Sequence, residues 1–438
     1  MATTFLTKTL SASPTDNNKW TFSCWFKRTG FETQTLIYSN DGSTSNVTEV
    51  AISDAAKMVF QNKVGGSTTM NLTTNRLFRD VSAFYHVVAV FDSSNSTEAD
   101  RQIIYINGVR ETSFATNNPA SLNEVSTINS GNVLKIGKGN TSEYFNGLMS
   151  HVHFVDGTAY PASTFGSTDS TTGEWEINTS PSVTYGTNGF FILKDGNSVT
   201  DQSGNSNNFT VAGGTLTNTE DCPDNNFATL NPLDNYYAGS TFSNGNNTIV
   251  SVAGSNTYNT STIGVASGKF YSEVKVNTNN DNVVGIAGGF STSDTSKLED
   301  GANNYGYVGF DGTVMNNGST LATYGTYTTG DIIGIAVDCT NNKFYVSKNG
   351  VFQGSADPSN NTGGLSITAA ASVINNVYMF AGGENSGART VTHNWNFGNG
   401  YFGTTAVSSA GTNASGIGIF EYDVPTGYTA LSTKGLNL

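Results

Sequence analysis

The chain reads HVVAVFDSSN over residues 86–95 and IIYINGVRETSF over residues 103–114, and this stretch decides the fold. A similar stretch recurs in the second half, as GDIIGIAVDCTNN over residues 330–342 and KFYVSKNGVFQG over residues 343–354. Each copy has the pattern of a buried strand, a polar turn and a hairpin closed by Asn-Gly, two residues that tolerate the positive φ of a two-residue loop. The repeat predicts two β-sandwiches in series.

Short runs around both copies alternate between apolar and polar residues. In WTFSCWFK (residues 20–27), every second residue from Trp20 to Phe26 is apolar, which is the period of a strand. Turn-forming Gly, Asn, Asp and Ser separate such runs, and almost no segment has the pattern of a long amphipathic helix. We therefore predict an all-β chain of two jelly-roll sandwiches.

The composition limits the classes of partner. Only 12% of the 438 residues are charged, and the formal net charge is −14. A surface of this sign lacks the basic face that nucleic acid or an anionic membrane requires, so we expect neither partner. The sequence has no apolar run long enough to span a bilayer and no signal-peptide pattern at its start, so we expect a cytoplasmic product without membrane insertion.

Paired carboxylates are the first candidates for catalysis, because retaining glycoside hydrolysis needs two carboxyl groups about 5 Å apart. Two acidic pairs have an aromatic residue between them: Glu174 with Glu176, and Glu421 with Asp423. Neither pair lies on a regular strand pattern, so we interpret both as surface carboxylates and predict no enzymatic activity. A glycan depolymerase is kept only as the third alternative.

Histidines and Asp-rich loops are the candidates for a metal site. His151 and His153 alternate along one strand pattern, but no third zinc ligand is close in sequence. Residues 39–46 (SNDGSTSN), Asp92 and residues 156–158 (DGT) offer oxygen atoms of the kind that calcium binds. Ordinary turns use the same residue types, so we predict no cofactor, with calcium as the alternative.

Tyrosines are the candidates for ligand binding. In the stretch YGYVGFDG, Tyr305 and Tyr307 share one strand face, and Asp311 follows them. Tyrosine rings can stack on sugars or anchor a protein partner, although the same two residues could instead pack against the second sheet. Tyr236 and Tyr237, at the start of YYAGSTF, offer the same alternatives.

Four motifs between residues 20 and 166 are WTFSCWFKR, YHVVAVFD, IYINGV and YFNGLMSHVHFVDGTAYPASTFG. Together they resemble the laminin-G-like branch of the concanavalin A-like lectin/glucanase superfamily. Five motifs between residues 267 and 398 are SGKFYSEVKV, VGIA, GDIIGIAVD, KFYVSKNGV and NWNFG. These resemble a SPRY domain, which implies a second β-sandwich close to the concanavalin A type.

The two resemblances divide the chain. They imply a laminin-G-like sandwich at residues 1–166 and a SPRY-like sandwich at residues 240–398. Residues 167–239 are then a connector with a few strands, and residues 399–438 are a C-terminal tail. The predicted fold class is therefore all-β, with two concanavalin A-like β-sandwich (jelly-roll) domains in tandem.

The connector contains NNFATLNPLD (residues 225–234), and the tail contains PTGYTALSTKGL. With the two sandwiches, this order of parts resembles virion structural and tail-fibre-like proteins of marine bacteriophages, including cyanophages. The resemblance implies a homo-oligomeric virion surface protein, assembled in the host cytoplasm, that contacts other virion proteins and binds a host-surface glycan or protein. The alternative is a capsid decoration or tail-assembly protein without receptor binding.

Overall fold

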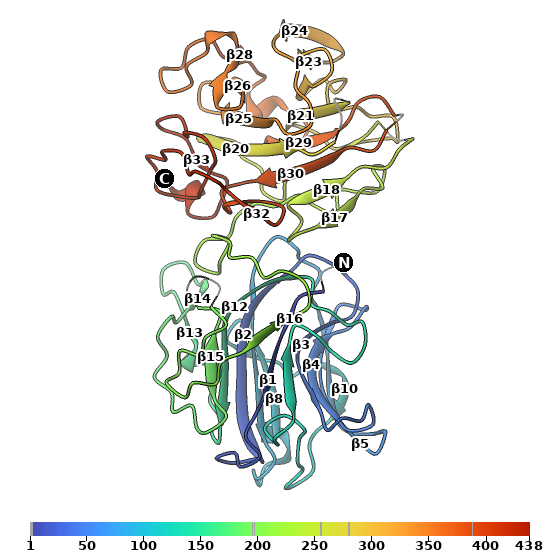
Figure 1. Ribbon diagram of the computed structural model, residues 1–438, viewed down its shortest axis with the longest axis vertical. Helices are drawn as coiled ribbons and strands as arrows, with labels where there is room; N and C mark the ends of the chain where they lie inside the picture. The colour runs from blue at the N-terminus through green and yellow to red at the C-terminus, as the bar shows by residue number, and fades with distance from the viewer. Residues whose placement is uncertain (1–2, 195, 197, 255, 279–280, 388) are drawn as a thin grey trace. The chain divides into compact units, whose positions relative to one another are not determined.

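The computed structural model divides the chain into two compact units, Met1–Asn218 (unit 1) and Thr219–Leu438 (unit 2) (Figure 1). The residues that the structure describes are 3–194, 196, 198–254, 256–278, 281–387 and 389–438. Within them every regular element is a strand or a three-residue 3₁₀ turn. No helix in this part of the chain has the length and apolar character needed to cross a membrane. The all-β prediction is confirmed.

Unit 1 contains two antiparallel sheets that enclose one core. The larger sheet has eight strands, in the order β10 (Phe114–Asn118), β6 (Ser67–Leu77), β5 (Lys57–Val64), β4 (Val47–Ile52), β3 (Gln34–Asn40), β11 (Val133–Ile136), β1 (Phe5–Thr9) and β16 (Thr210–Ala212). The smaller sheet has six strands, in the order β15 (Phe190–Ile192), β12 (Gly147–Asp156), β2 (Lys19–Arg28), β7 (Tyr85–Asp92), β8 (Gln102–Ile106) and β9 (Val109–Arg110).

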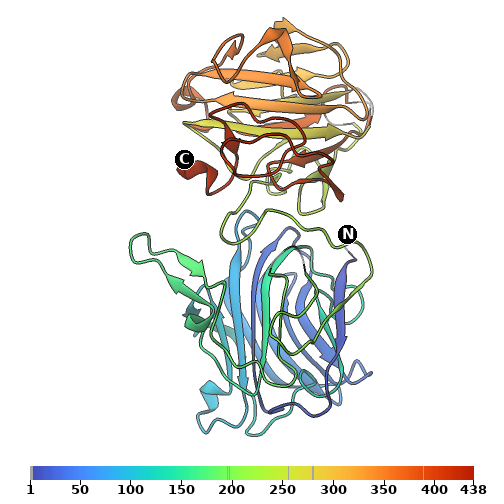
Figure 2. The same cartoon turned by 60° about the vertical axis from the view of Figure 1, so that its left-hand side comes forward.

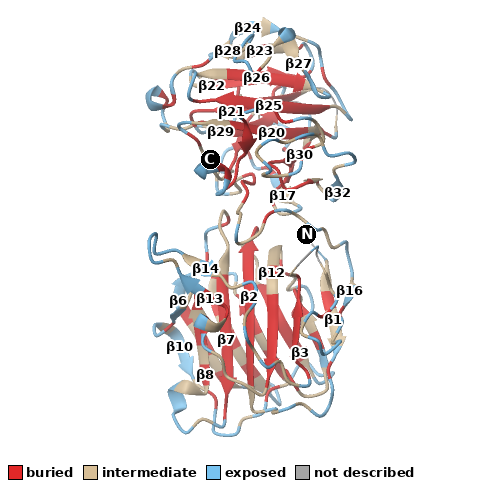
Figure 3. Ribbon diagram, turned by 90° about the vertical axis from the view of Figure 1, so that its left-hand side faces the viewer, coloured by how far each residue is buried: buried red, intermediate tan, exposed pale blue. Residues whose placement is uncertain are grey.

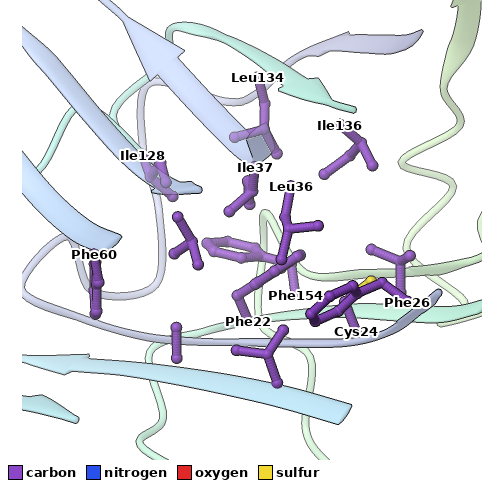
Figure 4. Packing of buried hydrophobic residues seen from close by; sticks show 14 of the residues in the cluster. Phe22, Cys24, Phe26, Leu36, Ile37, Phe60, Ile128, Leu134, Ile136 and Phe154 are labelled. Atoms are coloured by element: carbon purple, nitrogen blue, oxygen red, sulfur yellow. The ribbon is translucent and has the colours of Figure 1, made fainter. Parts of the chain in front are cut away.

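Alternate residues of the central strands fill the core of unit 1. Phe22, Cys24 and Phe26 of β2 are fully buried, as their period-two spacing predicted. Figure 4 shows them gathered with Leu134 and Ile136 of β11, which belong to the opposite sheet. Both sheets therefore contribute aromatic and aliphatic side chains to one core, with Phe60 of the eight-stranded sheet packed on Trp20 of the six-stranded sheet.

Residues 157–186 cover the outer face of the six-stranded sheet, and we call them the first covering segment. The segment contains η2 (Ala162–Thr164) and a hairpin of β13 (Gly166–Thr168) and β14 (Trp175–Ile177), which is visible at the flank of unit 1 in Figure 2. Phe165 of this segment is buried in a cluster with Val88 and Val90 of β7. The sheet thus buries both faces, one toward the core and one, which carries apolar and polar side chains, toward the cover.

Unit 2 also contains two sheets around a core. The larger sheet has the order β17 (Thr241–Ser243), β18 (Thr248–Val250), β30 (Thr392–Asn396), β20 (Lys269–Val276), β25 (Ile332–Asp338), β26 (Lys343–Lys348) and β27 (Val351–Phe352), with β28 (Leu365–Ser366) on β26 and β33 (Thr429–Ala430) on β20. The other sheet has the order β19 (Tyr258–Thr260), β29 (Met379–Glu384), β21 (Asn282–Ala287), β22 (Asn304–Val308), β23 (Thr313–Asn316) and β24 (Ser319–Thr323). Figure 3 shows β25 and β26 buried and the edge strand β24 largely exposed.

The outer face of the larger sheet in unit 2 is covered in turn by residues 411–430, which we call the second covering segment. Phe420 and Tyr428 of this segment are buried in a cluster with Tyr271 of β20 and Tyr345 of β26. The segment ends in β33, which pairs in parallel with β20. Both units therefore use later chain to cover one sheet face.

Both Asn-Gly hairpins form where the sequence predicted them, between β8 and β9 and between β26 and β27. The φ angles are 47° and 79° for Asn107 and Gly108, and 48° and 81° for Asn349 and Gly350. Two successive positive φ angles are the signature of the type I′ turn, whose twist matches that of the flanking strands.

The covering segments bear on the predicted domain divisions. Of the predicted connector, residues 167–218 fall in unit 1 and residues 219–239 in unit 2. Of the predicted tail, residues 411–430 cover a sheet face of unit 2. Both stretches follow a sandwich whose outer sheet face carries an apolar cluster, and burial of that cluster draws the following chain onto the face.

Candidate functional site

A buried polar cluster lies under the first covering segment. Ser23 Oγ of β2 and His86 Nε2 of β7 are 2.8 Å apart. Trp175 of β14 donates its indole N–H to His86 Nδ1 at 3.0 Å. The His86 ring also stacks on Trp25, with ring centroids 4.7 Å apart. A serine in contact with a histidine is the first requirement of an activated nucleophile, so this cluster is a candidate for catalysis.

The tautomer of His86 excludes that role for the pair. An indole N–H can only donate, so Nδ1 of His86 is the unprotonated acceptor and Nε2 carries the proton. Nε2 then donates to Ser23 and cannot remove its proton, which general-base catalysis would require. Burial also lowers the pKa of His86 to about 3. The cluster instead holds the first covering segment on the sheet.

The two histidines considered for zinc lie at a bulge in β12. The register shifts between Ser150 and His153, and His151 has a φ of 48°. His153 Nδ1 is 2.9 Å from Tyr185 Oη, and both histidine rings contact Phe191 of β15. In the part of the chain that the structure describes, no three His, Cys, Asp or Glu residues are grouped to hold a metal ion.

The carboxylates considered for calcium already accept hydrogen bonds or ion pairs from protein donors. Asp156 accepts three backbone N–H groups and one side-chain amide, from Thr15, Asp16, Asn188 and Asn129. Asp41 accepts a backbone hydrogen bond from Ser43 at 3.0 Å within its own turn. Asp92 forms an ion pair with Lys19 at 3.3 Å. These contacts use the oxygen atoms that calcium would need, so turn chemistry accounts for the three loops.

The two acidic pairs considered for hydrolysis differ in their surroundings. Glu174 and Glu176 are exposed on either side of Trp175 in the β13–β14 hairpin. Glu421 and Asp423 both accept hydrogen bonds from nearby turns, including the backbone N–H of Ser408 and of Thr412. Solvent exposure of the first pair and separate turn hydrogen bonds to the second differ from the fixed mutual geometry that a glycosidase requires of its two carboxyl groups.

Tyr305 and Tyr307 of β22 lie in the core of unit 2, where they are 4% and 0% exposed. The Tyr307 ring packs on Tyr327, with centroids 4.8 Å apart, and its hydroxyl donates to the carbonyl of Gly325. Their ring faces therefore pack against neighbouring side chains and are not presented to a ligand. Asp311, in the turn after β22, is exposed and accepts hydrogen bonds from the residue two positions later.

Residues 233–240 form an exposed loop that we call the tyrosine loop, and a side-chain clamp fixes its shape. Asn235 Oδ1 accepts the Ser240 N–H and Asn235 Nδ2 donates to the Ser240 carbonyl, both at 2.8 Å. Asn259 of β19 donates to the Asp234 carbonyl at 2.6 Å. The loop backbone is thereby tied to β19, the edge strand of the second sheet of unit 2.

The clamped loop presents Tyr236 and Tyr237, which are 89% and 41% exposed. Their rings meet edge to face, with centroids 4.9 Å apart and an interplanar angle of 90°. Leu233 and Val252 add exposed apolar surface, at 60% and 43%. Aromatic rings on a backbone that is already ordered lose little conformational entropy on binding. Of the four candidate tyrosines, these two are the accessible pair.

A pocket of about 250 Å³ lies beside the same edge strand, where Tyr258 lines it and the next residue, Asn259, holds the tyrosine loop. Its other walls come from the connection between β21 and β22 and from Ile374, which precedes β29. Tyr258 and Ile374 lie far in sequence from this connection and share no motif or period with it. Only the fold brings them together.

Comparison with known proteins gives matches by family model and by structure. Residues 6–163 match the family model described as the concanavalin A-like lectin/glucanases superfamily. This part of unit 1 therefore has the concanavalin A-like, laminin G-type fold, of a kind commonly used for binding. The comparison with curated proteins gives no match.

Similar solved structures include the SPRY domain of human HERC1, at 16% identity and a TM-score of 0.27, covering 34% of this chain and 86% of that one. Another is a SAP-like pentraxin from Limulus polyphemus, at 14% identity and a TM-score of 0.27, covering 34% of this chain and 69% of that one. Domains LG4-5 of the mouse laminin alpha1 chain cover 92% of this chain and 82% of their own, at 9% identity and a TM-score of 0.28.

Proposed function

We propose that this chain is a non-enzymatic recognition protein on a virion surface, of the tail-fibre or appendage type, and that it binds a host-surface glycan or protein through the tyrosine loop. The observation that carries the proposal is Tyr236, whose ring is 89% exposed on a loop clamped by two hydrogen bonds. A large exposed aromatic side chain on a fixed backbone has the properties of a binding hot spot.

The virion setting rests on the resemblance of NNFATLNPLD and its flanking sandwiches to phage structural proteins. In this setting the protein is assembled in the host cytoplasm, forms a homo-oligomer and contacts other virion proteins. The non-enzymatic part rests on the chemistry of the candidates: Ser23 faces a protonated Nε2, and the acidic pairs are either exposed or engaged by turn hydrogen bonds.

A binding experiment with cells of the bacterial host tests the proposal. The purified protein should bind the cells and block phage adsorption, and Tyr236→Ala should weaken binding at least tenfold, as expected for a central aromatic contact. Phe310→Ala is the matched control, because Phe310 is a 50% exposed aromatic ring of the same unit outside the loop.

Three results would each contradict a part of the proposal. If the intact protein binds no host cells and occupies regular positions over the capsid lattice, it is a decoration protein. If Tyr236→Ala weakens incorporation into virions but leaves cell binding unchanged, the tyrosine loop contacts another virion protein. Shortening of host polysaccharide during incubation would instead indicate a depolymerase.

A further inference from the structure

Three polar side chains in the unit 2 pocket make no hydrogen bond or ion pair with the residues that the structure describes. Lys297, Asp300 and Asn303 line the pocket, and within the described residues no hydrogen bond or ion pair engages their side chains. Phe290 and Ile374, which are 48% and 78% exposed, add apolar surface to the lining. The pocket therefore offers an ammonium, a carboxylate and an amide beside an aromatic ring.

The size of the pocket limits its ligand. Pockets for drug-sized molecules usually measure about 300–1,000 Å³. At about 250 Å³, this one suits a single small ring. A pyranose has an apolar face of C–H groups that can lie on the Phe290 ring, and hydroxyl groups on its edge that both donate and accept hydrogen bonds.

The charge of the pocket favours a neutral ligand. Lys297 and Asp300 carry opposite charges and are the lining residues that are charged. The chain as a whole has a net charge of −14, which repels acidic sugars. A carboxylate accepts from sugar hydroxyls, an ammonium donates to them, and the amide of Asn303 does both.

The walls of the pocket are fixed before any ligand enters. Nδ2 of Asn316, in β23, donates to the carbonyls of Ala302 and Asn304 at 2.9 and 2.8 Å. Asn304 in turn donates to Tyr258 Oη at 2.9 Å, and that hydroxyl donates to the carbonyl of Gly289 at 2.9 Å. These hydrogen bonds join the loop, the hairpin and the edge strand, so binding would order few groups.

We propose that this pocket binds one neutral pyranose residue, stacked on Phe290 and hydrogen-bonded by Lys297, Asp300 and Asn303. The inference rests on the proposed recognition function for its class of ligand, and it adds a site distinct from the tyrosine loop. A host glycan could then contact unit 2 at two places: one part of the glycan would pack on Tyr236, and one of its sugar residues would enter the pocket.

Saturation-transfer NMR on the full chain tests the inference with methyl glycosides of glucose, galactose, mannose and N-acetylglucosamine, and with methyl glucuronide. At least one neutral glycoside should bind with a Kd on the order of 1 mM, as expected for a ligand of this size. Phe290→Ala should weaken that binding at least tenfold, and Asp300→Ala should weaken it similarly. Phe310→Ala should leave it unchanged, since this equally exposed ring lies outside the pocket.

The outcomes separate this inference from the proposed function. If no glycoside binds, or if binding survives both Phe290→Ala and Asp300→Ala, the pocket is not a sugar site, whereas Tyr236-dependent cell binding would still support recognition. Tighter binding of the glucuronide than of every neutral glycoside would overturn the charge argument. Because Phe290 and Asp300 are both exposed, their variants should keep the wild-type melting temperature, which circular dichroism checks.

Discussion

In unit 1 and unit 2, the repeated hairpins are closed by the same hydrogen bonds. The covering segments that pack on them, however, are held by different buried side chains. In unit 1, Asn107 Oδ1 accepts the backbone N–H of His86 at 2.8 Å. In unit 2, Asn349 Oδ1 accepts the backbone N–H of Ile332 at 2.9 Å. Each asparagine therefore ties its hairpin to the neighbouring strand, in addition to adopting the positive φ that the turn requires.

At the glycine of each hairpin, the absence of a side chain leaves space in which an aromatic ring packs. Trp175 of the first covering segment packs against Gly108, and Tyr422 of the second packs against Gly350. At both glycines, an added Cβ would fall well inside van der Waals contact with that ring. The repeated Asn-Gly pair thus forms the turn and also provides the packing surface for an aromatic side chain of the covering segment.

Under the covers, the two units bury opposite kinds of titratable group. Unit 1 buries His86, whose pKa is lowered to about 3 by desolvation. Unit 2 buries Glu273 of β20, whose pKa desolvation raises to about 7. The Glu273 carboxylate accepts the backbone N–H groups of Glu421 and Tyr422 at 2.8 and 2.9 Å. The hairpin is a shared scaffold, whereas the group that holds each cover is particular to its unit.

The largest expected effect comes from adding a methyl group at the hairpin glycine on which the aromatic ring packs. Gly108→Ala should destabilise unit 1 by about 3 kcal/mol, because the new methyl group displaces Trp175 and the alanine must adopt a positive φ. Gly350→Ala should destabilise unit 2 to a similar extent by displacing Tyr422. Urea unfolding followed by pulse proteolysis and mass spectrometry would report each unit separately.

Gly42→Ala separates the two causes. Gly42 has a φ of 94° but no heavy atom within 4 Å of its Cβ position, so this variant adds backbone strain alone, at about 1 kcal/mol. Equal losses for Gly42→Ala and Gly108→Ala would mean that the ring contact contributes nothing, and the comparison of the two hairpins would fail.

Loss of the asparagine amide should have a smaller effect. Asn107→Ala and Asn349→Ala should each cost about 2 kcal/mol, since a strand N–H loses its acceptor and the turn loses a residue suited to positive φ. Asn107→Gly, which keeps the turn but not the acceptor, should cost about half as much. Asn107→Asp should recover most of the loss, because a carboxylate also accepts the His86 N–H. Thermal unfolding of the four variants checks the order.

The parts of the fold that depend on near neighbours were predictable from sequence. Period-two alternation located β2, and the Asn-Gly pairs located both hairpins, because φ preference and side-chain period are local properties. The covering segments were not, because a cover has no period of its own. Residues 167–186 resembled a connector, although their fold is decided by the apolar face of β7 beneath them.

Exposure explains why the candidate site was only partly predictable. Tyr236 and Tyr307 both lie in polar, glycine-rich sequence, so their local sequence does not distinguish a buried tyrosine from an exposed one. Tyr307 is buried because Tyr327, twenty positions later, returns to its ring, and Tyr236 is exposed because the Asn235 clamp holds the loop outward. The pocket is lined mainly by residues 289–304, but Tyr258 and Ile374 complete it from distant parts of the chain, and no local pattern indicated this.

The smallest expected effect is a change of about 1 to 2 kcal/mol in the free energy of unfolding of each unit between about pH 7 and pH 5. It separates the units most clearly, because the change has opposite signs in unit 1 and unit 2. His86 has an ordinary pKa of 6.5 in the unfolded chain and about 3 when folded. Acidification therefore protonates the unfolded state first, and unit 1 loses stability. Glu273 has an ordinary pKa of 4.5 and about 7 when folded, so the folded state takes up the proton first and unit 2 gains stability.

Other buried groups contribute to the pH dependence of stability in the same range. Burial lowers the pKa of His153 as well, which adds to the loss in unit 1, and raises that of Glu299 to about 7, which adds to the gain in unit 2. Glu49 in unit 1 and His393 in unit 2 act in the opposite direction. Pulse proteolysis at the two pH values should show the unit 1 midpoint falling and the unit 2 midpoint rising. Glu273→Gln should flatten the slope of unit 2 alone, because an amide does not titrate; parallel slopes in the wild-type units would show that the two covers do not differ in this way.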